Sequence, residues 1–294
     1  MNYTEFLCNI KQSVTEHFDS SFNVSIRTIE KNNGKCLDGL IICNPDYNIS
    51  PTIYLNPYYH RYLDGVSLDD IFEDIITTYN EYMPSDNFDI NAITDFATCK
   101  NSIAFKLINY KKNEDMLSHI PHFKYLDFAI IFQILLDKNS YGNASITIHE
   151  QLLNKWRLSI DDLLNVALIN TPLLLPHQLL NLNDLIPSDI FPCTFADELV
   201  DMYVLTNTNK INGASAILYD GLLNQISKKL HSDLVLLPSS IHEFIILPHN
   251  NDMSFNAMTE MVNSVNETSV SDEEILSDHV YFYDSKSKRL IIPD

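Results

Sequence analysis

The sequence predicts an α+β fold in two lobes, with antiparallel or mixed sheets that carry helices packed on one face. Apolar residues at helical spacing alternate along the chain with short extended apolar runs. Several of these runs are joined by turns of a few polar residues, which cannot form parallel crossovers. The 294 residues are 45% apolar, enough for the core of one large unit or of two domains.

The first elements are predicted to be a helix and a β-hairpin. Residues 3–18 place apolar side chains at three-and-four spacing, which is typical of an amphipathic helix. Apolar and polar residues then alternate over 22–26, and an apolar run resumes at 37–43. The segment KNNGK at 31–35 supplies Asn and Gly for the turn between them.

A third strand is predicted at 51–55, followed by a helix that Ser67 caps, with Asp70 three residues later. Two further extended segments follow at 103–110 and 125–137. The second is apolar on both faces, which indicates a central strand, although its pattern also fits a buried helix. The predicted buried stripe of the capped helix is Leu68, Ile71, Phe72, Ile75, Ile76 and Tyr79.

Polar and Gly residues at 137–145 predict a division into lobes 1–140 and 141–294, although an ordinary loop in one compact unit gives the same pattern. Ser159 is predicted to cap the next helix, with Asp162 near its amino end. Four prolines within 172–192 predict short helical turns instead of a long element. The predicted inward residues of the helix are Ile160, Leu163, Leu164, Ala167 and Leu168. The leucines predicted to pack the helical turns on the surface are Leu173, Leu174, Leu175, Leu179 and Leu180.

The last third of the chain predicts a sheet with helices against it, because extended runs, turns and amphipathic segments follow one another closely. The predicted strands are 201–206, 214–219, 233–238, 242–247 and 279–284, and the predicted helices are 221–230 and 254–265.

Charge and targeting signals indicate a protein that stays in the cytoplasm and binds other proteins. With 19 Lys and Arg against 39 Asp and Glu, the formal net charge is -20. Such a surface repels phosphate backbones and favours basic partners, so no direct nucleic-acid binding is expected. No segment approaches the ~18 to 20 apolar residues of a membrane span. The amino terminus MNYTEFLCNIKQ has no secretory pattern.

No metal or cofactor site is predicted. The pairs His149–Glu150 and His242–Glu243 both lack the second histidine of a zincin motif, since Leu153 and Ile246 stand in its place. With only 6 Gly, the chain has no glycine-rich phosphate loop. The odd, widely spaced set of cysteines predicts reduced thiols, with a redox or metal role for Cys36 and Cys43 as the alternative. These cysteines are Cys8, Cys36, Cys43, Cys99 and Cys193.

The segment LLPSSIHEFIILP, residues 236–248, holds the candidate catalytic residues Ser240, His242 and Glu243, with Asn263 and Asn266 as possible helpers. A hydrolase or transferase needs a nucleophile, a base and an orienting acid that converge. No GxSxG elbow is present, and neighbours on a strand point to opposite faces. The favoured interpretation is therefore a hairpin turn whose serine hydroxyls bond nearby backbone groups.

The segment YLNPYYHRYLDG offers a candidate binding surface, because Tyr and Arg are favoured as interface anchors. The alternative is amphipathic packing in which the phenol hydroxyls reach solvent. The candidate binding residues are Tyr58, Tyr59, His60, Arg61 and Tyr62.

Several motifs, taken in order, resemble an uncharacterised bacterial family, the domain-of-unknown-function 5688 family of gut Gram-positive anaerobes. They are YLNPYYHRYLDG, MYVLTN, GASAILY, LPSSIHEFIILP, MVNSVNETSV and LSDHVYFYD. The resemblance covers nearly the whole chain and implies a cytoplasmic bacterial protein, but no activity, ligand or catalytic residue.

The sequence leads to a non-enzymatic protein-binding module with an acidic surface as the first functional hypothesis. A hydrolase or transferase centred on Ser240, His242 and Glu243 is the second. A third is an acidic mimic of nucleic acid that inhibits a defence enzyme, which requires a stripe of acidic residues. The sequence predicts no oligomeric state.

Overall fold

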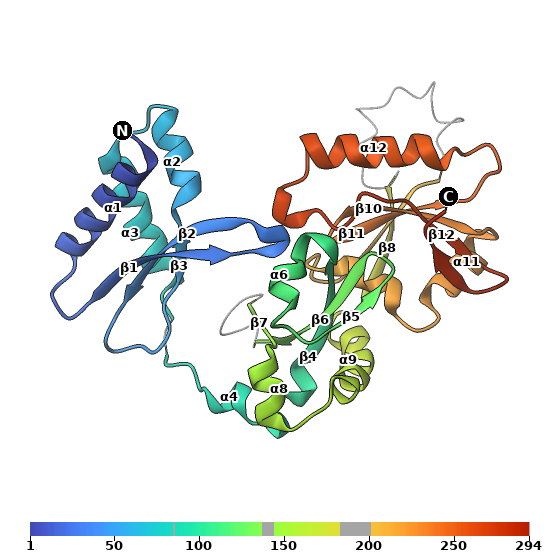
Figure 1. Ribbon diagram of the computed structural model, residues 1–294, viewed down its shortest axis with the longest axis horizontal. Helices are drawn as coiled ribbons and strands as arrows, with labels where there is room; N and C mark the ends of the chain where they lie inside the picture. The colour runs from blue at the N-terminus through green and yellow to red at the C-terminus, as the bar shows by residue number, and fades with distance from the viewer. Residues whose placement is uncertain (85, 137–143, 183–200, 294) are drawn as a thin grey trace.

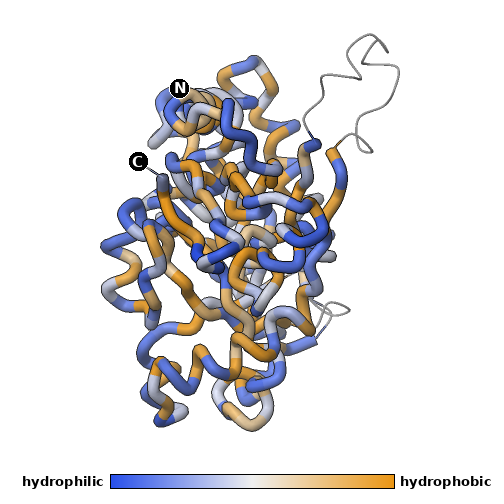
Figure 2. Tube along the Cα trace, turned by 90° about the vertical axis from the view of Figure 1, so that its right-hand side faces the viewer, coloured by the Kyte–Doolittle hydropathy of each residue, from blue (hydrophilic) through white to orange (hydrophobic). Residues whose placement is uncertain are grey.

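The computed structural model describes residues 1–84, 86–136, 144–182 and 201–293. They form three antiparallel sheets with helices between and around them, which confirms the predicted α+β class (Figure 1). Hydrophobic and hydrophilic stretches alternate along the chain trace (Figure 2), as expected when each element buries one face. None of the described helices is long and apolar enough to cross a membrane.

The amino-terminal sheet has the order β1-β2-β3 and carries three helices on one face (Figure 1). Its elements are α1 (Tyr3–His17), β1 (Asn23–Glu30), β2 (Cys36–Cys43), β3 (Thr52–Tyr54), α2 (Leu55–Leu63) and α3 (Leu68–Tyr82). The predicted first helix, hairpin and Ser67 cap are confirmed, and the Ser67 side chain accepts from the Asp70 amide. The buried side chains of this unit are Phe6, Ile10, Val14, Leu40, Ile42, Ile53, Leu55, Ile71, Ile75 and Tyr79.

The tip of the β1–β2 hairpin is joined to later parts of the chain. Asn33 has a left-handed φ of 60°, and its backbone amide donates to Asn113 Oδ1 at 2.7 Å. Its side-chain amide donates to the carbonyl oxygens of Asp272 and Ile275, both at 2.7 Å. The ammonium of Lys35 pairs with the Asp272 carboxylate. The predicted turn is therefore also a point of attachment between distant segments.

The second sheet has the order β4-β6-β5, with β7 also paired to β6. Its strands are β4 (Ile103–Asn109), β5 (His122–Tyr125), β6 (Phe128–Leu135) and β7 (Ser145–Thr147). The central position predicted for this apolar run is confirmed for β6. However, the predicted segment 125–137 is divided, because the chain turns at Leu126, whose φ is 54°. Short helices precede and connect these strands: α4 (Asn91–Thr94), α5 (Phe96–Cys99), η2 (Lys100–Ser102), η3 (Lys111–Asn113) and α6 (Glu114–Leu117).

Helix α9 (Ile160–Leu174) follows α8 (Glu150–Trp156) and lies against β4. Ser159 and Asp162 form the predicted cap at its start as a capping box. At its end, the Thr171 hydroxyl donates to the Ala167 carbonyl and accepts from the β4 amide of Phe105 at 3.0 Å. One hydroxyl thus satisfies a backbone donor of β4 that faces the helix.

The prediction for 172–192 is wrong where the structure describes it. Pro172 lies inside the last turn of α9, where losing one intrahelical hydrogen bond costs little of the helix. Residues His177–Asn181 then form β8, because they pair with β9 (Tyr203–Asn207) at the edge of the third sheet. Pro176 precedes this strand and no proline lies within it, so the prolines do not prevent the pairing. Residues 183–192 lie outside the described residues.

The third sheet has six strands in the order β13-β12-β10-β11-β9-β8. The further strands are β9 (Tyr203–Asn207), β10 (Leu234–Ser240), β11 (Glu243–Pro248), β12 (Tyr281–Asp284) and β13 (Arg289–Ile291). The helical elements are η5 (Gly213–Leu218), α11 (Leu222–Leu230), α12 (Phe255–Thr268) and η6 (Asp272–Glu274). The strand predicted at 214–219 is wrong, since this segment is the 3-10 helix η5. Its small residues allow close approach: a Cβ on Gly213 would lie 2.6 Å from the His242 carbonyl oxygen.

Both faces of the six-stranded sheet are covered. Val262 of α12 packs on Val235 and Leu237 of β10 on one face. On the other face, η5, α11 and the second sheet share one large core with the sheet. Buried residues from both sides of position 140 belong to this core, including Phe132 and Phe244. The division into lobes at 140 stays a prediction.

Candidate functional site

The turn between β10 and β11 is held by backbone contacts. Ser240 pairs with Glu243 across the turn, with a register shift after Pro238. The Ser240 hydroxyl accepts from the backbone amide of His242 at 3.0 Å. The Ser239 hydroxyl donates to the Glu243 carboxylate at 3.3 Å. The serines thus stabilise a bend, which is the arrangement favoured by the sequence interpretation.

The His242 imidazole joins this turn to two other segments. Its Nδ1 accepts from the backbone amide of Asn212 at 3.0 Å, which places the ring proton on Nε2. Nε2 faces Glu274 Oε1 at 3.4 Å. The Asn212 contact lies just before η5, and the Glu274 contact lies in η6. The ring therefore acts as a structural bridge with both nitrogens occupied.

The predicted catalytic residues do not assemble a nucleophile and base. Within the described residues, no hydrogen bond joins the Ser240 hydroxyl to the His242 imidazole, and Glu243 bonds Ser239 instead of the ring. Asn266 is buried, and its amide donates to the Ser277 carbonyl and to Asp278 Oδ1. The predicted helper therefore anchors the segment after α12 instead of facing the turn.

His242→Ala is expected to lower the free energy of unfolding by about 1–3 kcal/mol, because it leaves the Asn212 amide without its acceptor. His242→Asn, which keeps a side-chain acceptor, is expected to lose less. Urea unfolding of the two variants and the wild-type protein measures this. A loss below about 0.5 kcal/mol for His242→Ala, the usual range of a surface substitution, would contradict the bridging role.

The tyrosine-rich segment forms α2, and its phenol rings pack on the amino-terminal core. Tyr59 contacts Tyr3 at 4.9 Å and Phe6 at 5.2 Å between ring centroids. Tyr58 and Tyr62 pack against the same core. The exposed candidates are His60 and Arg61, and the Arg61 guanidinium pairs with Asp74 at 2.5 Å. The structure shows the packing role of the tyrosines, and their binding role stays a prediction.

Reactive thiols and metal ligands do not gather in the described part of the chain. Cys8, Cys36 and Cys43 are exposed free thiols, and Cys99 is a buried one whose pKa is raised by burial. Cys193 lies outside the described residues. No group of three or more His, Cys, Asp or Glu among the described residues could hold a metal ion.

The comparison with family models covers the segments described above, from α1 to the end of β12. The model of a family of unknown function, DUF5688, matches residues 3–285. The chain belongs to this DUF5688 family. The resemblance predicted from the motifs is thereby confirmed. No curated protein and no solved structure matches the chain.

A second polar cluster in the DUF5688 chain joins the second and third sheets. The Ser277 hydroxyl donates to Asp127 Oδ2 at 2.6 Å, and the Tyr281 hydroxyl donates to Asp127 Oδ1 at 2.5 Å. His279 Nδ1 lies 3.2 Å from the same carboxylate. Ser277 and Tyr281 are 0% exposed, so a substrate cannot reach their hydroxyls. Sequence reasoning missed this cluster because Asp127 is 150 residues from Ser277 and carries no local pattern.

The outer face of α9 in the DUF5688 chain is apolar and exposed. Exposed fractions are 44% for Leu168, 67% for Ile169, 74% for Leu173 and 38% for Leu174. We call these four residues the α9 apolar face. The opposite side of the helix buries Leu163, Ala167 and Thr171, so the prediction that Leu168 faces inward is wrong. Exposed apolar side chains are therefore present on a helix whose other side meets the core.

Proposed function

We propose that this DUF5688 protein is a non-enzymatic, cytoplasmic protein-binding module and that the α9 apolar face is its docking surface. The observation that supports the proposal is the gathering of exposed apolar side chains in the last two turns of one helix, where Ile169 and Leu173 lie one turn apart on the side away from Leu163 and Ala167. Single exposed apolar residues are normal on protein surfaces, but neighbouring ones favour an interaction site. Helix α9 is held firmly in place by its capping box and by the Thr171 contact with β4.

Charge indicates what kind of partner fits. The chain carries a formal net charge of -20, and the exposed residues Asp161 and Asp162 lie in the first turn of α9. Apolar side chains flanked by acidic ones complement a segment that is apolar on one side and basic at its edges. The occupant we propose is an amphipathic basic segment of another protein, which the acidic surface attracts before docking.

The probe is an amphipathic peptide of Leu and Lys. A peptide of Leu and Glu with the same apolar spacing serves as the control for the charge of the peptide. The double variant Ile169→Asp, Leu173→Asp is expected to bind the Lys peptide at least about tenfold more weakly than the wild-type protein, which is ~1.4 kcal/mol. Both changes lie at exposed positions, so the fold should be retained. Fluorescence anisotropy of labelled peptide measures the dissociation constants.

Leu63→Asp is the matched control, because Leu63 is 60% exposed but lies alone on α2. It adds one negative charge, half of what the double variant adds, and is expected to bind like the wild-type protein. Equal binding by all three proteins would show that overall charge, not the α9 apolar face, attracts the peptide. Concentration-dependent dimerisation that the double variant abolishes would show that a second copy covers the face.

A further inference from the structure

The amino-terminal sheet and its helices have a hydrophobic core of their own. That core contains no residue after Met83, and the other cores of the described chain contain none before Ile93. We call residues 1–84 and 86–88 the amino-terminal unit, and the described residues from Asp89 onward the body. No shared core fixes the position of the unit on the body, which is the usual condition for movement between two parts of a chain.

The chain passes from the unit to the body between Phe88 and Asp89. The Asn48 side chain accepts from the Phe88 amide and donates to the Phe88 carbonyl, both at 2.8 Å, so the unit holds Phe88. The Asp89 carboxylate and carbonyl accept from the amides of Asn91 and Ala92, so Asp89 belongs to the start of α4 in the body. A short link between two held residues is where a pivot is expected.

The second attachment of the unit is the tip of the β1–β2 hairpin, which reaches across to the body (Figure 1). Within the described residues, every hydrogen bond and ion pair that joins residues 1–84 to the body is made by Asn32, Asn33 or Lys35. The Asn33 side chain uses both of its polar atoms, because its Nδ2 donates to two carbonyls of the η6 segment and its Oδ1 accepts from Asn113 Nδ2 at 2.9 Å. The tip sequence KNNGK has no apolar side chain, so this attachment is entirely polar.

Docking of the tip also has a cost. The tip lies against β4, where the side chain of Lys106 is half-buried. In the described part of the chain, no ion pair involves Lys106. Burial, together with the ammonium of Lys31 at the base of the tip, lowers the pKa of Lys106. Departure of the tip would remove this like-charge interaction.

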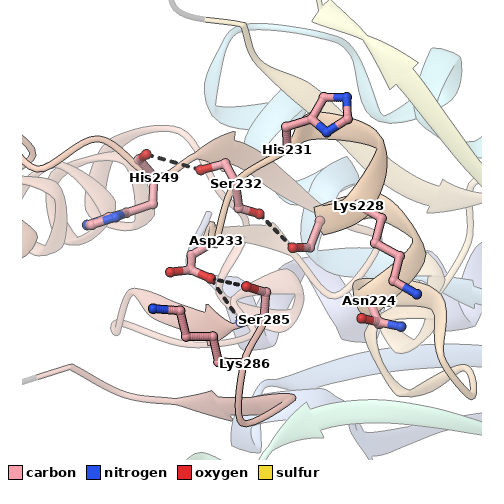
Figure 3. A pocket seen from close by; sticks show the side chains of 9 residues that line it. Asn224, Lys228, His231, Ser232, Asp233, His249, Ser285 and Lys286 are labelled. Atoms are coloured by element: carbon pink, nitrogen blue, oxygen red, sulfur yellow. Dashed lines mark hydrogen bonds between the residues drawn. The ribbon is translucent and has the colours of Figure 1, made fainter.

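Polar contacts inside the body are placed differently. Figure 3 shows Asp233, which accepts from Ser285 Oγ, and Ser232, which donates to the His249 carbonyl at 3.1 Å. These residues adjoin β10, β11 and β12, which already pair in the six-stranded sheet and share its core. Loss of such a bond leaves the strands joined. Loss of the tip contacts, in contrast, removes every described hydrogen bond between residues 1–84 and the body.

We propose that the tip residues Asn32, Asn33 and Lys35 form a latch, and that the amino-terminal unit, still folded, rotates away from the body about Phe88–Asp89 when the latch is released. A polar tip can leave its partners without exposing a hydrophobic core, so this opening costs less than unfolding. Movement of a folded unit about a few loop residues is a common form of conformational change. The latch is separate from the α9 apolar face and does not depend on the proposed docking function.

Asn33→Asp tests the latch. The carboxylate has nearly the shape of the amide but cannot donate to the two η6 carbonyls, and Asp tolerates the left-handed backbone of this position. Hydrogen exchange of the backbone amide at position 33 is expected to become at least about tenfold faster, since its acceptor Asn113 moves away. Small-angle X-ray scattering is expected to show a larger radius of gyration. Asn23→Asp is the matched control, because it adds the same charge at the exposed far end of β1 and is expected to change neither quantity.

Two further variants test the same balance. Asn33→Gly also accepts the left-handed backbone but removes the side-chain contacts, so its exchange at position 33 is expected to be faster than in the wild-type protein. Lys106→Met removes one of the two like charges and is expected to slow exchange at position 33. Faster exchange in Lys106→Met would contradict the repulsion that favours opening.

Three outcomes would overturn the latch. Unchanged exchange at position 33 in both Asn33 variants would show that these contacts do not hold the tip. Faster exchange in α3 as well would show that the tip contacts support the fold of the unit itself. An unchanged radius of gyration beside faster exchange at position 33 would show that the tip alone loosens while the unit stays in place.

Discussion

Phe244→Ala is expected to lower the free energy of unfolding by about 3–5 kcal/mol, because it removes a fully buried aromatic ring. Phe244 is 0% exposed, and its ring centroid lies 6.2 Å from Phe128 of β6 and 5.9 Å from Tyr281 of β12. The three rings join the second sheet to the third. The cavity left by the substitution would therefore weaken both sheets.

Phe255→Ala is the matched control, since Phe255 is only half-buried at the start of α12 and its loss should cost less. Urea unfolding gives the free energies, and amide hydrogen exchange locates the effect. Faster exchange is expected in β6 and in β11. The exchange rates in α3 should not change, because α3 packs in a separate core. If the chain is divided into lobes at 140, amide exchange in β6 should instead stay as slow as in the wild-type protein. Equal losses at the two phenylalanines would show that Phe244 does not join the sheets.

The sequence predicted those elements whose pattern is repeated over many residues. The helices α1, α3 and α12 have a clear apolar stripe and a side-chain cap at Asn2, Ser67 or Ser254. Such local signals survive in the folded protein because packing agrees with them. In contrast, η5 resembles a strand in sequence. Its form depends on Gly213 lying against the His242 carbonyl, a contact between distant segments.

The candidate sites were less predictable, because each depends on residues that are far apart in the chain. The segment around His242 was recognisable as a turn, but its partners Asn212 and Glu274 were not. The α9 apolar face was missed because Leu168 fits the inward spacing of its helix. Only the orientation of the helix on β4 decides which of its apolar sides is exposed.

Tyr281→Phe is expected to lower the free energy of unfolding at pH 7 by about 1.5–3 kcal/mol, the usual contribution of a hydrogen bond to a charged group. The Tyr281 hydroxyl donates to Asp127 Oδ1 and lies 2.6 Å from Ser277 Oγ. Tyr283→Phe is the control on the same strand, because the described residues provide no hydrogen-bond partner for the Tyr283 hydroxyl. Tyr283→Phe should lower the free energy of unfolding by less than Tyr281→Phe does.

The pH dependence of this loss shows whether it comes from the Tyr281 hydroxyl itself or from a general disturbance of the fold. Burial, together with the Asp127 charge, raises the pKa of Tyr281 far above the value of about 10 in an unfolded chain. The stabilisation is therefore complete below pH 10 and is lost as the pH rises above it, since only the unfolded chain releases the proton. The difference between wild-type protein and Tyr281→Phe should be about 1.4 kcal/mol smaller at pH 11 than at pH 9. A difference that stays constant over this range would mean that the Tyr281 hydroxyl does not keep its proton in the folded protein.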